Sequence, residues 1–149
     1  MTETPPQIPY WHLYVDDDGV SRQRQCHMTE FEKTAISEGA TPQWNGKDYP
    51  AGVTVKMVVL PVGWEGGWHR NPAPQWIIPL SGRWSVESMD GTVIEMGPGE
   101  ISFGEDQDAR DAEDGQTGHA SRTVGDEAAR LLLVQFDKKI ERDTDCPFT

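Results

Sequence analysis

The residues of this chain predict an all-β fold. Glycine and proline, which break helices and favour turns, are frequent, with 15 Gly and 11 Pro spread through 149 positions. No stretch of about 12 residues has the apolar spacing of an amphipathic helix. Several segments instead alternate apolar and polar residues, and Asp-Gly pairs typical of hairpin turns separate them. Short strands joined by tight turns indicate a sandwich or a barrel.

The N-terminal part of the chain predicts a hairpin. Residues 11–15 form its first strand, an Asp-Gly turn follows, and residues 20–28 return. Residues 29–39 are expected to hold one short helical turn that begins with a threonine cap. Residues 41–50 are expected to be irregular.

The clearest strand pattern lies over residues 53–60. Its odd positions are apolar and share one face, with Thr54 and Lys56 on the other face; the apolar set is Val53, Val55, Met57 and Val59. Further strands are expected, in chain order, over residues 76–80, 83–88, 92–96, 101–103, 119–124 and 131–136.

The chain is expected to form a single domain over residues 1–149, because this length suits one core and no linker or repeat is visible. Its parts are N-terminal strands over 8–36, a barrel core over about 53–136, and a C-terminal surface arm over 138–149. The polar and acidic segment 107–118 is expected to be a surface loop.

The charge of the chain bears on its partners. The formal net charge is −12, from 25 acidic and 13 basic residues, so nucleic acids and anionic membrane surfaces are not expected as partners. No apolar run approaches the length of about 20 residues that a membrane span needs. With no signal peptide visible, a cytoplasmic protein is expected. Cys26 and Cys146 fit no zinc spacing and are expected to be free thiols.

One set of spacings resembles a known family. Gly63, His69, Asn71, Gln75 and Gly82 stand at the spacings of the first motif of the cupin superfamily, in which Asn71 replaces a second histidine and Gln75 replaces a glutamate. The glycines and the first histidine match the motif.

The second cupin motif is matched with an insertion. The run from Gly97 to Glu100 resembles its opening turn, but Arg110 stands where the motif histidine is usual. His119 lies nine residues later, which indicates an inserted loop over 107–118 with His119 as the motif histidine. The segment from about 53 to 136 also resembles a group of small, functionally uncharacterised cupins, a likeness that includes Trp68 and Arg122.

The resemblance implies a cupin-type conical β-barrel, a double-stranded β-helix or jelly roll of antiparallel strands with an N-terminal hairpin arm. It places His69, Gln75 and His119 in the barrel as ligands of a divalent transition metal such as Fe, Mn, Ni or Zn, with Asn71 close by. Two imidazoles and a neutral amide form a poorer site than three histidines and a glutamate, because no negative charge offsets that of the ion.

Other residues complete the candidate site. Glu105 and the neighbouring Asp106 end a strand near the rim, where burial could raise a carboxyl pKa and make Glu105 a general base beside His69 and His119. Trp64 and Trp68 are expected either to pack in the core or to stack on an apolar substrate at the mouth. Asn71, Gln75 and Arg122 are the polar candidates for substrate binding.

Three functions remain open at this point. The first is a metal-dependent enzyme of oxygenase, isomerase or lyase type that acts on a small organic molecule. The second is a metal-free cupin enzyme in which a histidine or Glu105 transfers a proton, and the third is a non-catalytic sensor of a small molecule. A homodimer is expected, with the N-terminal hairpin supplying strands to the edge of a partner's sheet.

Overall fold

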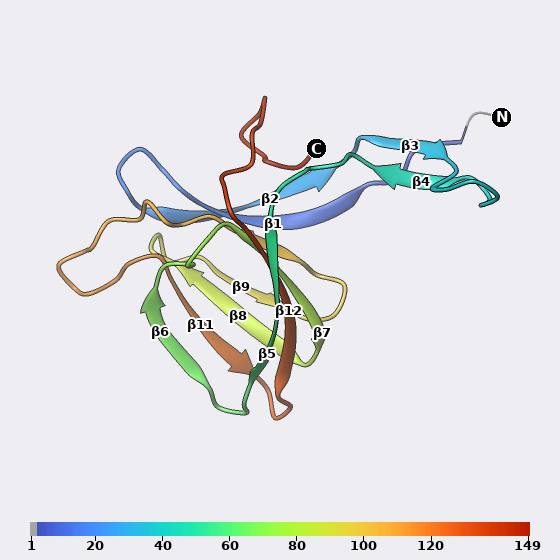
Figure 1. Ribbon diagram of the computed structural model, residues 1–149. Coiled ribbons are helices and arrows are strands. Elements are labelled where there is room, and N and C mark those ends of the chain that lie inside the picture. Colours follow the sequence, from blue (N-terminus) through green and yellow to red (C-terminus); the bar gives the residue numbers. More distant parts are fainter. Residues whose placement is uncertain (1–2) are drawn as a thin grey trace.

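The computed structural model describes residues 3–149, and this part of the chain contains twelve strands in three sheets. Within it there is no helix, and hence none that could cross a membrane. The all-β fold class is therefore confirmed. Figure 1 shows two larger sheets forming the body, with a small hairpin projecting from it.

The larger sheet has six strands in the order β2-β1-β10-β7-β12-β5. All its neighbouring pairs are antiparallel except β1 and β10, which run parallel. The strands are β1 (Ile8–Val15), β2 (Ser21–Met28), β5 (Val53–Leu60), β7 (Gln75–Ser81), β10 (Ser102–Gly104) and β12 (Ala129–Phe136).

The second sheet has four antiparallel strands in the order β6-β11-β8-β9. They are β6 (Glu65–His69), β8 (Arg83–Ser88), β9 (Val93–Met96) and β11 (His119–Val124). The two sheets face each other across the main apolar core, to which both contribute. That core contains Leu13, Leu60, Ile77, Ala129 and Leu131 from the larger sheet, and Trp84, Val86 and Met96 from the smaller one.

The two larger sheets face each other, and among the described residues no strand pairing closes them into one barrel. The N-terminal hairpin belongs to the body, because β1 pairs with β10 of the same chain. The projecting arm is instead a separate hairpin of β3 (Phe31–Thr34) and β4 (Gln43–Gly46). The helical turn expected over 29–39 and the irregular segment expected over 41–50 were therefore wrong.

The C-terminal segment is not a surface arm. Ile140 is 5% exposed and Phe148 is 2% exposed, and both pack on the outer face of the larger sheet. Phe148 contacts the rings of Tyr10, Trp76 and Phe103, and its carbonyl accepts a hydrogen bond of 2.7 Å from the Tyr10 hydroxyl. The tail therefore covers part of this face as a second apolar core.

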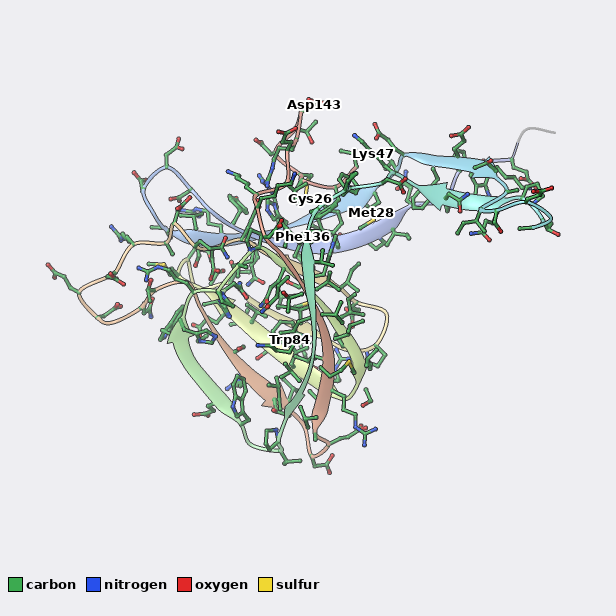
Figure 2. The ribbon with its side chains drawn as sticks, viewed as in Figure 1. Cys26, Met28, Lys47, Trp84, Phe136 and Asp143 are labelled. Carbon is green, nitrogen blue, oxygen red and sulfur yellow. A yellow bond between two sulfur atoms is a disulfide. The ribbon has the colours of Figure 1, made fainter. Side chains whose placement is uncertain are left out.

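A disulfide joins Cys26 on β2 to Cys146 in the tail, so the expectation of free thiols was wrong. The two residues are 120 positions apart in sequence, and both lie in the second apolar core. In Figure 2, Cys26 lies close to the path of the C-terminal segment. The cross-link ties the last residues of the chain to its first hairpin.

The segment over 107–118 contains no strand or helix, as expected of a surface loop. It leads from β10 to β11 and ends at Gly118. Part of it contacts the body, because the backbone N–H of Arg110 donates to the carbonyl of Gly19 at 2.8 Å. The loop thereby delivers His119 to the start of β11.

Candidate functional site

The two motif histidines lie side by side. His69 ends β6, His119 begins β11, and the two residues are direct partners in the antiparallel pairing of these strands. Their ring centroids are 4.6 Å apart. His119 is only 4% exposed, whereas His69 is accessible to solvent. The approach of these two residues, predicted from motif spacing, is therefore observed.

Gly118 makes this approach possible. It has a φ of +62°, which residues with a side chain rarely adopt, and a Cβ placed there would lie 2.2 Å from the carbonyl oxygen of His69. The backbone before His119 can therefore lie directly against the end of β6. Gly118 also accepts a hydrogen bond of 2.5 Å from the Ser21 hydroxyl, which holds the loop against β2.

A buried carboxylate holds His119. Oδ2 of Asp106 lies 2.7 Å from Nδ1 of His119, and Asp106 is 0% exposed. Its other oxygen accepts from the backbone N–H of Asn71 at 2.8 Å and from the Asn71 side-chain amide at 2.9 Å. Burial alone would raise the pKa of Asp106, but the hydrogen bonds from His119 and Asn71 outweigh it and lower the pKa below its usual value.

Since an ionised carboxylate can only accept, Nδ1 of His119 donates to Asp106. The neutral imidazole then carries its free lone pair on Nε2. His69 is oriented in a similar way, with Nδ1 3.0 Å from the carbonyl oxygen of Gly67. Each histidine therefore has one ring nitrogen engaged by the protein and the other left for further contacts.

The polar network continues into the larger sheet. Nε2 of Gln75 donates to Oδ1 of Asn71 at 2.6 Å, and Oε1 of Gln75 accepts from Nε2 of Gln135 at 2.9 Å. Gly104 lets Asn71 approach, because a Cβ there would lie 2.4 Å from the Asn71 side-chain nitrogen. A continuous chain of hydrogen bonds thus runs from β12 to His119.

Strand register shows which further residues share this face. On β12, Gln135 pairs with Gln75 of β7 on one side and with Thr54 of β5 on the other. Leu133, two residues earlier on the same face of β12, pairs with Lys56. Leu133 packs against the main core, so these positions are on the inner face. The inner face of the larger sheet is therefore apolar at one end and carries amides at the other.

Sequence reasoning missed Asp106 as the partner of His119, and it missed Gln135 altogether. The sequence did mark Gln135 as unusual, since it is the one polar residue in the apolar run from Leu131 to Phe136. Asp106 was noted only together with Glu105, and nothing in the sequence shows which of two adjacent acids faces the histidine.

The metal-ligand set predicted from sequence is only partly assembled. Both imidazoles can offer Nε2, but the Gln75 amide is engaged on both its atoms, by Asn71 and Gln135. Within residues 3–149, no three His, Cys, Asp or Glu side chains come together in a way that could hold an ion. The Gln75 amide is thus held by hydrogen bonds on both its atoms, and a metal on His69, Gln75 and His119 stays a prediction.

Glu105 faces away from this site. Its carboxylate accepts a bidentate contact from Arg142, and Oε1 lies 2.7 Å from Nε2 of His12. Burial alone would raise the pKa of Glu105, but these hydrogen bonds and charges outweigh it and lower the pKa to about 2. The expectation of a general base with a raised pKa was therefore wrong, because the sequence did not reveal Arg142 as a partner.

The other candidates lie around the site rather than in it. Trp64 is partly buried against the main core, and its ring covers Gly66, where a Cβ would lie 2.4 Å from the indole. Trp68 is one position from His69 on β6, and Arg122 is three positions from His119 on β11. Because side chains alternate along a strand, each lies on the face opposite to that of its histidine. Trp64 therefore packs against the core, and stacking of Trp64 or Trp68 on a substrate stays a prediction.

Two surface hollows of about 1040 Å³ and 850 Å³ lie elsewhere. The first is lined by residues that include His12, Glu105 and Arg142, and the second by residues that include Tyr49 and Cys146. Neither is lined by His69 or His119. Both lie beside the C-terminal tail.

Comparison with known proteins shows distant similarity of fold. No family model and no curated protein matches the sequence. A crystal structure of protein NMB1881 from Neisseria meningitidis is 20% identical, with a TM-score of 0.43, covering 58% of this chain and 75% of that chain. The Schizosaccharomyces pombe Cnp3 cupin domain is 15% identical, with a TM-score of 0.41, covering 88% and 84% respectively. Identities and TM-scores this low indicate no shared function.

Proposed function

We propose that this protein acts on a small organic molecule by proton transfer, with His119 as the acid–base group and Asp106 as its positioning residue. One observation carries this proposal: the 2.7 Å contact between a fully buried carboxylate and Nδ1 of His119. A carboxylate in that place selects the imidazole tautomer and stabilises the imidazolium that forms when Nε2 takes a proton.

His69 has the second role in the proposal. Its ring lies beside that of His119, and it is the more exposed of the two. A substrate that enters from solvent meets His69 first and can accept a hydrogen bond from it or donate one to it. The pair then acts as one group that moves a proton and one that holds the reacting oxygen or nitrogen atom.

A metal-dependent enzyme is the second candidate, and one observation favours it. In metal sites, a ligating histidine usually donates its other ring N–H to a carboxylate or carbonyl, and both His69 and His119 have such a partner. The two imidazoles alone would hold an ion such as Fe, Mn, Ni or Zn weakly, so further donors would have to come from substrate or water.

The test is a screen of small organic acids, alcohols and amines for binding and turnover, with His119→Gln, Asp106→Asn and His69→Ala beside the wild type. We expect His119→Gln to abolish turnover and Asp106→Asn to lower its rate while binding persists. The matched control is His27→Gln, an exposed histidine on β2. Turnover that is unchanged in Asp106→Asn would remove the proton-transfer role.

Metal analysis separates the two candidates. Protein purified without an affinity tag, then supplied with Fe, Mn, Ni and Zn in turn and dialysed against a weak chelator, should retain no stoichiometric ion under the first proposal. Retention that is lost in His69→Ala would support the second. Binding of a compound that the wild type never converts would instead indicate a sensor.

A further inference from the structure

One edge of the larger sheet carries an uncovered apolar stripe. Strand β5 lies at the end of the sheet and pairs only with β12. Its four odd-numbered residues are largely exposed: Val53 at 52%, Val55 at 62%, Met57 at 63% and Val59 at 60%. They lie on the outer face, opposite the face that carries Lys56 and Leu60. The C-terminal tail covers the other end of this outer face.

The backbone of the same residues faces the free edge. The N–H of Asp137, the residue that follows β12, donates to the carbonyl of Gly52 at 3.0 Å, so Gly52 turns its hydrogen-bonding groups toward the β12 side. Along an antiparallel strand these groups alternate in direction, so Val53, Val55, Met57 and Val59 turn theirs away from β12. The N–H of Phe136, opposite Val53, donates instead to Pro74, which agrees with this direction.

Nothing in β5 protects this edge against pairing. Natural edge strands are usually short, charged, bulged or interrupted by proline. β5 has eight residues, an unbroken register with β12, no proline and one charge, Lys56. The other edges of the two main sheets are protected: β2 carries two arginines, the pairing of β6 is irregular, and β9 has four residues.

Charge favours a second copy of this chain at this edge. A net charge of −12 repels copies from one another over most of the surface. Strands β5 and β12, however, contain no acidic residue and carry one basic residue each, Lys56 and Arg130. This is a region where two copies can meet without bringing carboxylates together.

We propose that two copies pair antiparallel through β5, which joins their larger sheets across a two-fold axis. Such pairing is self-complementary, since each copy supplies the same edge. A register that sets Lys56 opposite Lys56 of the second copy is disfavoured. Centring the axis on Val55 instead sets Lys56 opposite Thr54 and Val53 opposite Met57.

The apolar area exposed on β5 indicates how tightly the two copies bind each other. Taking about 30 Å² for each methyl or methylene group, the four exposed side chains uncover roughly 250 Å² of apolar area per copy. A stable interface buries about 500 Å² or more on each side. The area beyond that of the four side chains would come from the backbone edge of β5 and from the stems of Thr54 and Lys56. We therefore expect a dimer that dissociates on dilution.

The experiment is sedimentation velocity of the full chain over a wide concentration range, with Val55→Glu as the disrupting variant. Wild type should shift from monomer to dimer as concentration rises, and Val55→Glu should weaken the dimer at least tenfold. The matched control is Val93→Glu, which adds the same charge at a valine that is 51% exposed on β9. Circular dichroism checks that both variants are folded.

Hydrogen exchange of the wild type gives a second readout that needs no variant. The amides of Val53, Val55 and Met57 should exchange rapidly in dilute protein and become protected as the dimer forms. A wild type that is monomeric at the highest concentration overturns the proposal. A dimer that Val55→Glu leaves intact, or one that forms without protection of these amides, overturns it as well.

Discussion

Asp106 holds His119 from inside the protein, with Oδ2 2.7 Å from Nδ1 and neither residue more than 4% exposed. The carboxylate is satisfied by three donors, two of them from Asn71. These hydrogen bonds favour the ionised form of Asp106, and they lower its pKa below the usual value despite its burial. The pair therefore links the folding of this region to the chemistry proposed for it.

Replacing this carboxylate should affect stability and the histidine together. Asp106→Asn removes a charge-assisted hydrogen bond, which we expect to cost about 2 kcal/mol in the free energy of unfolding. It should also shift the ¹⁵N resonances of His119, because an amide nitrogen facing Nδ1 favours the other tautomer. The control is Asp108→Asn, an exposed position in the same loop, which should change neither urea unfolding nor the His119 signals.

Glu105 predicts a specific loss of stability in acid. Its pKa falls from 4.5 to about 2 on folding, so its stabilising effect is complete above pH 4.5 and is lost as the pH falls to about 2. The effect is on the order of 3 kcal/mol, from about 1.4 kcal/mol for each unit. His12 also lowers stability in acid. Burial holds its pKa below 6.5 in the folded protein, so as the pH falls the imidazole is protonated more readily in the unfolded chain than in the folded one.

Urea unfolding at several pH values tests this. Wild type should lose stability steeply between pH 4.5 and 2, and Glu105→Gln should flatten the curve there while lowering stability at neutral pH. Glu95→Gln is the control, since Glu95 and its partner Arg83 are both about half exposed and such pairs contribute little. Equal pH profiles for wild type and Glu105→Gln would contradict the assigned role.

The sequence predicted strands best where alternation and turns agreed. The bounds of β5, β8 and β11 are those expected, because each has a clear period of two and an adjacent turn. β6 was missed because Gly66 and Gly67 have no preference for a strand, and it exists through its pairing with β11. Alternation also left open which face of β5 is buried, and in the structure it is the face of Val58 and Leu60 that packs on the main core.

The site was predictable only in part. Motif spacing brought His69 and His119 together, since spacing in a β fold determines which strand ends meet. It did not reveal the direction of Glu105 and Asp106, which point to opposite sides because they are adjacent in extended chain. Nor did it reveal the disulfide, because pairing over 120 positions depends on where the tail returns. The cytoplasmic location stays a prediction, although disulfides persist mainly in oxidising compartments.

The disulfide should contribute strongly to stability. Closing a loop of this length is expected to contribute about 4 to 5 kcal/mol by restricting the unfolded chain. Cys146→Ser should therefore lower the free energy of unfolding by several kcal/mol and make residues near Phe148 sensitive to proteases. Adding a reductant should lower the stability of wild type toward that of the variant and leave the variant unchanged. A wild type that is insensitive to reductant would contradict this.

Gly118 should be the glycine of the acidic loop that tolerates substitution least. In Gly118→Ala the new Cβ would lie 2.2 Å from the carbonyl oxygen of His69, and the φ of +62° adds strain of its own. The strands β6 and β11 must then separate, which moves His69 from His119. Gly115→Ala is a matched control, because Gly115 has a φ of +87° but nothing within 4 Å of a Cβ. We expect about 1 to 2 kcal/mol for Gly115→Ala, from the backbone alone. Gly118→Ala should cost clearly more and should also change the NMR signals of both histidines, whereas equal costs would show that the close approach to His69 has no energetic weight.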